Sequence, residues 1–208
     1  MTASVRANFL PEQRFIPLRP ALQEHLAKIG NAISPGNFLS ICDEMLVKFL
    51  TDTFERVSAD EGSIWLLDEE KRHLVVAFNS GPNADKIVGF KQPLNKGIIS
   101  LVVASEQAII ESNVYKDAKY SADLDKKLHN TTYAMIAVPL YFLKQVRGVI
   151  SCVQLFDVLV QQGEPMPAGK TPQGFKPEHL IAVQTAAAVI RELIDYRLLG
   201  TAVGWLRR

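Results

Sequence analysis

The side chains best suited to chemistry in this chain are two cysteines and four histidines. Cys42 and Cys152 lie far apart in the sequence, and no Cys-x-x-Cys pair occurs. Each cysteine falls in an apolar run, where a buried thiol is more common than a disulfide. The histidines are scattered without the spacing of a metal site: His25, His73, His129 and His179. We recognise no nucleophile beside a base and no carboxylate pair, so we expect a protein that is not an enzyme.

Composition and charge narrow the class of protein further. A chain of 208 residues, 48% of them apolar, is long enough for one domain with a substantial core. Lys and Arg number 23 against 22 Asp and Glu, which leaves no net field to attract nucleic acid or an anionic membrane. No apolar run reaches the ~18 residues of a membrane span, and the N-terminus lacks a signal-peptide pattern. We therefore expect a soluble, cytoplasmic protein.

The most informative stretch runs from residue 95 to residue 157. It reads as a glycine turn, a short apolar helix, a buried strand, a long polar loop and two long apolar strands. The last two strands, near 134–142 and 146–156, form a hairpin that is too apolar on both faces for a wet sheet surface. The polar loop, Ser112 to Thr132, is long for a simple connection. Folded over one sheet face, such a loop would close a small-molecule pocket.

The remaining sequence supplies helices at both ends and further strands between them. Apolar residues at helical spacing predict a helix after Pro20, a second near 38–57 and a long final helix that begins at Pro177. Shorter elements are predicted between these helices: strands near 63–67, 73–79, 87–90 and 108–111, and helices near 98–106 and 121–130.

Several of these segments, in this order, resemble a GAF domain, the sensory module of many signalling proteins. The matching segments are GSIWLLDEEKRHLVVAFNSG, PLNKGIISLVVASEQAIIESNV, AMIAVPLYFLKQVRGVISCVQLF and GFKPEHLIAVQTAAAVI. Gly97 at the helix start, Val138-Pro139-Leu140 and Gly148-Val149-Ile150 are the strongest marks. The resemblance implies an α/β (α+β) fold with a central antiparallel sheet of about six strands. Terminal helices would pack on one face, and loops and short helices on the other.

The resemblance also implies where a ligand would lie. We predict that its pocket walls come from the apolar strands, the short helix and the polar loop: Trp65, Phe90, Ile99, Val102, Tyr115, Tyr120, Tyr133, Met135 and Cys152. Asn113 stands where similar domains often carry Asp. Asn95 and Lys96, on the turn before the short helix, would suit an anionic group.

Known ligand classes of GAF-like proteins do not transfer directly to this sequence. Phe175 and Glu178 match part of the set that binds cyclic nucleotides, but Phe156-Asp157 replaces the expected Asn-Lys, so the set is broken. No Cys-His dipeptide is present for covalent bilin attachment. A GAF-like family that reduces free methionine sulfoxide needs cysteines in its pocket loops, whereas the segment 112–132 has none. The cofactor is therefore left open.

The two ends of the chain point to protein–protein contacts. We divide the chain into an extended arm (1–18), a GAF-like domain (19–199) and a C-terminal helical extension (200–208). Helices at both ends would leave an apolar stripe exposed, for which homodimerisation is the commonest solution. The residues predicted at this interface are Leu22, Leu26, Ile190, Ile194 and Leu198. A different protein partner would be contacted through the arm, the 158–176 loop or the C-terminal helix.

Two functions remain open at this point. The first is a non-catalytic regulatory domain that dimerises through its end helices and relays the binding of a small molecule or protein partner. The alternative is a GAF-like scaffold whose pocket is filled by its own apolar residues, such as Trp65, Phe90 and Met135. Such a scaffold would act only through protein–protein contacts.

Overall fold

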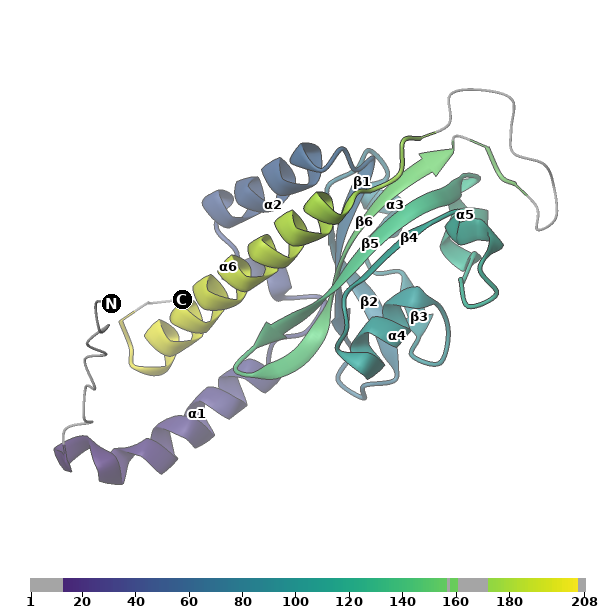
Figure 1. Ribbon diagram of the computed structural model, residues 1–208. Coiled ribbons are helices and arrows are strands. Elements are labelled where there is room, and N and C mark those ends of the chain that lie inside the picture. Colours follow the sequence, from purple (N-terminus) through teal and green to yellow (C-terminus); the bar gives the residue numbers. More distant parts are fainter. Residues whose placement is uncertain (1–12, 157, 161–171, 206–208) are drawn as a thin grey trace, which may run out of the picture.

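The protein is built on a six-stranded antiparallel sheet with helices on both faces (Figure 1). The computed structural model describes residues 13–156, 158–160 and 172–205. The strand order is β3-β2-β1-β6-β5-β4. The strands are β1 (Glu61–Leu67), β2 (His73–Asn79), β3 (Lys91–Pro93), β4 (Ile109–Ser112), β5 (Thr131–Phe142) and β6 (Gln145–Phe156). The α-helices are α1 (Arg19–Asn31), α2 (Glu44–Arg56), α3 (Ala84–Ile87), α4 (Ile98–Ser105), α5 (Asp123–Leu128) and α6 (Pro177–Ala202). Short 3-10 helices are η1 (Gln13–Leu18), η2 (Phe38–Ile41) and η3 (Val114–Lys116). The predicted sheet and its layers are confirmed.

Both strands of the β5–β6 hairpin lie inside the sheet rather than at an edge, as their two apolar faces predict. β6 pairs with β5 on one side and with β1 on the other. The contact between β6 and β1 is unusually close at Gly148, where an added Cβ would lie 1.8 Å from the Trp65 carbonyl oxygen. Glycine is therefore required at this position for the two strands to pair.

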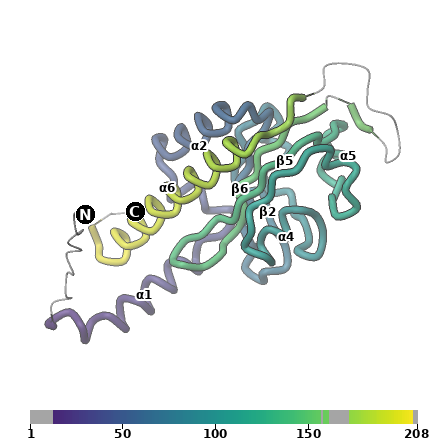
Figure 2. Tube along the Cα trace, in the orientation of Figure 1, coloured from purple at the N-terminus to yellow at the C-terminus, as the bar shows by residue number. Residues whose placement is uncertain are grey.

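Helices α2 and α6 cover one face of the sheet (Figures 1 and 2). Asp43 caps α2 by accepting a hydrogen bond of 2.8 Å from the Leu46 N–H. The same carboxylate pairs with Arg197 of α6 and so ties the two helices together. The core beneath them is made of fully buried apolar side chains such as Leu50, Phe54 and Ile136.

The other face of the sheet carries a second apolar cluster under α4 and the segment 113–130. Gly97 begins α4 with φ at +79°, a conformation that favours glycine. An added Cβ here would also lie 2.5 Å from Nε2 of Gln92. The predicted polar loop therefore does fold over the sheet, on the face opposite α2 and α6.

Some predicted elements differ from the structure. Residues 84–87 form the short helix α3, and the third strand follows at 91–93 because Gly89, at φ +84°, turns the chain between them. The second helix begins at Glu44 rather than near residue 38. Residues 13–18 of the predicted extended arm are the 3-10 helix η1, which continues into α1.

Residues 1–12, most of the predicted 158–176 loop and residues 206–208 lie outside the described residues. Within the described part of the chain, no helix is long and apolar enough to cross a membrane.

Candidate ligand-binding site

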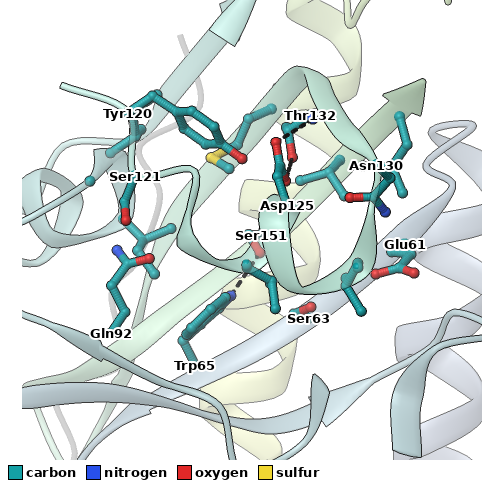
Figure 3. Close-up of a pocket in the computed structure, with 18 residues that line it drawn as sticks. Glu61, Ser63, Trp65, Gln92, Tyr120, Ser121, Asp125, Asn130, Thr132 and Ser151 are labelled. Carbon is teal, nitrogen blue, oxygen red and sulfur yellow. Dashed lines mark hydrogen bonds between the residues drawn. The ribbon is translucent and has the colours of Figure 1, made fainter. Parts of the chain in front are cut away.

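A cavity of about 50 Å³ lies between the sheet and the layer formed by α4, α5 and the segment before α5 (Figure 3). Its apolar lining comes from Trp65, Ile98, Ile99, Leu124, Leu128 and Met135. Its polar lining includes Glu61, Ser63, Gln92, Tyr120, Asp125, Asn130, Thr132 and Ser151. A cavity of this size holds roughly four water-sized positions, so as it stands it fits a ligand of only a few non-hydrogen atoms.

Trp65 forms the apolar wall on the sheet side. Its indole Nε1 donates a hydrogen bond of 3.0 Å to the Ser151 hydroxyl on β6. The indole also makes an edge-on contact with the ring of Phe90, at 6.3 Å between centroids. The indole orientation is thus fixed by one polar and one aromatic contact.

Asp125 provides a buried carboxyl group where α5 meets the start of β5. It accepts hydrogen bonds from the backbone N–H of Thr132 at 2.7 Å and from the Thr132 hydroxyl at 2.9 Å. Burial raises the pKa of Asp125 above its usual value, while the Thr132 donors and the Tyr120 hydroxyl act in the opposite direction. Burial likewise raises the pKa of Tyr120 well above the ordinary phenol value. The neutral Thr132 and Tyr120 groups leave the Asp125 charge without a cationic partner.

Glu61 provides a second buried carboxyl group at the start of β1. Its oxygens accept hydrogen bonds of 3.3 Å from the side-chain amides of Asn79 and Asn83. Burial raises the pKa of Glu61, the two amides lower it, and the nearby charges of Asp60 and Asp125 raise it further. The two carboxyls of the cavity therefore act on each other electrostatically.

Asn130 lines the same cavity as these two carboxyl groups. Its side chain is 8% exposed, and its Oδ1 atom is buried with no hydrogen-bond partner among the described residues. In Figure 3 the Asn130 side chain turns toward the space bounded by Asp125 and Glu61. An unpaired buried carbonyl oxygen is costly, by about 1–3 kcal/mol, which makes this atom the most conspicuous unsatisfied group at the site.

A larger hollow of about 640 Å³ adjoins the cavity on its outer side. Gly97, Tyr120 and Ser121 line both spaces and therefore form the partition between them.

Comparison with known proteins identifies the family. The model of the GAF domain matches residues 44–195, well over half of the chain. The chain belongs to the GAF domain family. GAF domains are regulatory modules that bind small molecules, and the described cavity lies inside the matched region.

One curated relative of this GAF domain is named "Probable 3',5'-cyclic phosphodiesterase pde-5", from Caenorhabditis elegans. It is 26% identical over 132 aligned positions, and the match covers 59% of this chain and 18% of the relative. The chain therefore spans less than a fifth of that protein's length, and the likeness concerns one part of it.

Solved structures confirm the fold. The GAF domain of a phosphoenolpyruvate-protein phosphotransferase from Coxiella burnetii has a TM-score of 0.59 at 17% identity, covering 91% of this chain and 97% of that one. The corresponding Acinetobacter domain has a TM-score of 0.55 at 19% identity, covering 90% and 97%. Free methionine-R-sulfoxide reductase from Neisseria meningitidis, solved with its substrate, has a TM-score of 0.51 at 15% identity, covering 95% and 97%. At these identities the likeness is one of fold alone.

Four of the predicted pocket residues line the cavity of this GAF domain: Trp65, Ile99, Tyr120 and Met135. Two others stand immediately behind the wall, since Phe90 packs on Trp65 and Val102 is fully buried in the same apolar cluster.

Four predicted residues do not line the cavity. Asn95 and Lys96 line the outer hollow, so an anionic group would meet them there rather than in the cavity. Asn113 has φ at +58° and serves to turn the chain into η3. The Tyr115 ring packs edge-on against Phe156 at 6.2 Å, and the structure does not place it at the cavity.

The structure corrects the placement of Tyr133 and Cys152. Both belong to the core under α2 and α6, on the far face of the sheet. Neighbouring residues of a strand point to opposite faces, so Ser151 faces the cavity and Cys152 does not.

Burial raises the pKa of the Cys152 thiol far above its usual value and that of Cys42 to about 12. Neither cysteine can supply a reactive thiolate to the cavity. The described residues also contain no group of three metal-ligating side chains.

The predicted dimer-interface residues of α6 are also placed differently. Ile190 and Ile194 are fully buried and Leu198 is 2% exposed, all in the core between α6 and the sheet. They are therefore not available to a partner chain. Leu22 and Leu26 of α1 are half-buried.

Glu61, Asp125 and Asn130 were not predicted as site residues. Glu61 and Asn130 stand at the borders of strands, where polar residues usually indicate exposed turns. The only sequence signal is in α5, where Leu124 and Leu128 are one turn apart and mark an inward face beside Asp125.

Proposed function

We propose that this chain is a cytoplasmic, non-catalytic sensory domain that binds a small molecule in the cavity between the sheet and α5. The observation that carries the proposal is the unpaired Oδ1 of Asn130 among buried polar groups, in a cavity roofed by the predicted polar loop. A scaffold with a dead pocket has no need for these groups, because burying them costs stability.

Strand β6 offers a physical route for relaying binding. Ser151 and Val153 line the cavity, whereas Cys152 between them packs in the core under α6. A ligand that shifts β6 therefore disturbs the core cluster to which Ile190 and Ile194 of α6 also belong. Closely packed cores transmit such shifts rather than absorbing them.

The relay would end in a dimer formed by the exposed ends of α1 and α6. Helix α6 has 26 residues, about 39 Å of helix, and its last turns extend past the sheet beside the start of α1 (Figures 1 and 2). Large apolar side chains are exposed on η1, which leads into α1, and on the last turns of α6 and the residues just after it: Phe15 60%, Ile16 53%, Leu18 59%, Tyr196 62%, Val203 42% and Trp205 76%. A second copy of the chain is the partner we propose for them, since the sheet of the same chain does not reach them.

Ligand binding is tested on the purified chain by native mass spectrometry and by thermal unfolding with a panel of nucleotides, amino acids and small amines. A true ligand raises the unfolding temperature by mass action. Val153→Phe fills the cavity and should abolish that rise, while Val88→Phe, at an exposed position away from the cavity, should preserve it. If native mass spectrometry detects no bound ligand and no compound of the panel raises the unfolding temperature, the chain is the scaffold instead.

Dimerisation is tested by sedimentation velocity with Tyr196→Glu, a change at the exposed end of α6. We expect monomers that remain folded. Gln184→Glu places a negative charge on the exposed surface of the same helix, away from the proposed interface, and should leave the dimer intact. A wild-type chain that sediments as a monomer would contradict this part of the proposal.

A further inference from the structure

The polar groups of the cavity have an unusual charge balance. Two carboxyl groups, Glu61 at 5% exposure and Asp125 at 4%, line the cavity. Their hydrogen-bond partners are the neutral side chains and backbone groups of Asn79, Asn83, Thr132 and Tyr120. Among the described lining residues there is no Lys, Arg or His. Buried carboxylates are normally paired with a cation, so positive charge is missing from this site.

Asn130 makes an independent demand of the same kind. Its Oδ1 atom is an acceptor, is buried and has no donor. It is turned into the space between Asp125 and Glu61 (Figure 3). A ligand that satisfies this atom must bring an N–H or O–H donor.

We infer that the cavity binds the protonated amino group of a small organic amine, held by Glu61, Asp125 and Asn130. This inference rests on the proposed function and specifies its ligand class. An alkylammonium group carries three N–H donors and one positive charge, and so supplies both what the carboxyl groups lack and what the Asn130 oxygen lacks.

The apolar walls favour an organic amine over an inorganic cation. Trp65, Ile99 and Met135 offer carbon surface on the sides of the cavity that the acceptors leave free. An indole face also attracts an ammonium group within about 6 Å. A hydrated metal ion would leave this surface unused, and the two carboxyl groups are too few for a carboxylate cage.

The sharpest test uses three probes of nearly equal size and different charge. Ethanolamine has four non-hydrogen atoms, which matches the roughly four water-sized positions of the cavity. Isothermal titration of the full chain at pH 7.5 compares ethanolammonium with neutral ethylene glycol and anionic glycolate, with potassium chloride as a fourth arm. We expect saturable binding of ethanolammonium and affinities at least tenfold weaker for the other three.

Variants locate the binding. Glu61→Gln keeps the shape of the side chain and removes its charge. We expect this change to weaken the binding of ethanolammonium at least tenfold. Asp123→Asn removes an exposed carboxylate two residues from Asp125 on the same short helix and should change nothing. Thermal unfolding of both variants without ligand shows whether each is folded.

The outcomes separate this inference from the proposed function. If glycolate, ethylene glycol or potassium binds as tightly as ethanolammonium, or if no amine binds, the charge assignment is wrong. If a compound other than an amine binds saturably and Val153→Phe abolishes that binding, the proposed function as a ligand-binding pocket is still supported. Ethanolammonium binding that Glu61→Gln leaves unchanged would place the amine elsewhere and overturn the inference.

Discussion

The indole of Trp65 on β1 donates its hydrogen bond across the sheet to Ser151 on β6, at 3.0 Å. This bond joins the Trp65 wall of the cavity to β6, which also contributes Cys152 to the core under α6. Trp65, which lines the cavity, is therefore linked to β6 through one defined contact.

Removing one partner of this bond should destabilise the fold. Ser151→Ala leaves a buried indole N–H without an acceptor, which costs about 1–2 kcal/mol in the free energy of unfolding. The expected coupling with Trp65→Phe is about 1 kcal/mol, because the double variant loses the bond only once. Urea unfolding of the four chains of this cycle measures both quantities. Strictly additive losses would show that the bond contributes nothing.

Close strand pairing at Gly148 gives a second prediction. A Cβ at this position would meet the Trp65 carbonyl oxygen at 1.8 Å, so Gly148→Ala must push β1 and β6 apart. We expect a loss of about 3 kcal/mol or more in the free energy of unfolding. Gly36→Ala is the matched control, since the nearest atom to its Cβ is the Ser34 hydroxyl at 4.0 Å. Equal stability of the two variants would refute the close approach.

Asp125 should hold the roof of the cavity in place. Asp125→Ala removes two hydrogen bonds to Thr132 and leaves its backbone N–H unpaired, at a cost of about 2–4 kcal/mol. Because these bonds tie α5 to β5, we expect faster amide hydrogen exchange in residues 121–130 than in α6. Uniform acceleration over the whole chain would mean that Asp125 supports the fold in general rather than the roof.

Glu61 should make stability depend on pH in a definite direction. Burial raises the pKa of its carboxyl in the folded chain above the ordinary value of 4.5. The folded state then binds its proton more tightly than the unfolded state, so stability falls as pH rises from about 4.5 through the folded pKa. Wild type should therefore lose stability relative to Glu61→Gln between pH 4.5 and pH 7.5 in urea titrations. The opposite trend would show that the amides of Asn79 and Asn83 outweigh burial.

The layers of this fold are predictable from its sequence. The face of the sheet that an individual residue occupies is harder to predict. The β5–β6 hairpin was predictable because both strands are apolar throughout. The same feature hides which face Cys152 occupies, since a strand buried on both sides has no alternation to read. Helix α6 presents a similar difficulty. Apolar residues occur around much of its circumference, so Ile190 and Ile194 could be assigned to either a partner or the sheet until the sheet was placed.

The burial of the polar groups in the cavity was not predictable, for a different reason. Glu61 and Asn130 lie at strand borders, where polar residues are ordinarily solvated. Their burial depends on α5 and the 113–130 segment folding back over the sheet, which is a long-range arrangement. Trp65, Ile99 and Met135 were found because large apolar residues are buried in almost any arrangement of these elements.

Fluorescence titration of Trp205→Phe tests the central claim most directly. The chain has two tryptophans, so this variant leaves Trp65, which lines the cavity, as its only indole reporter. With ethanolammonium we predict a saturable change in Trp65 emission that is absent when Val153→Phe is added. An emission that stays constant across the full ligand panel, or a change that survives the filled cavity, would contradict binding at this site.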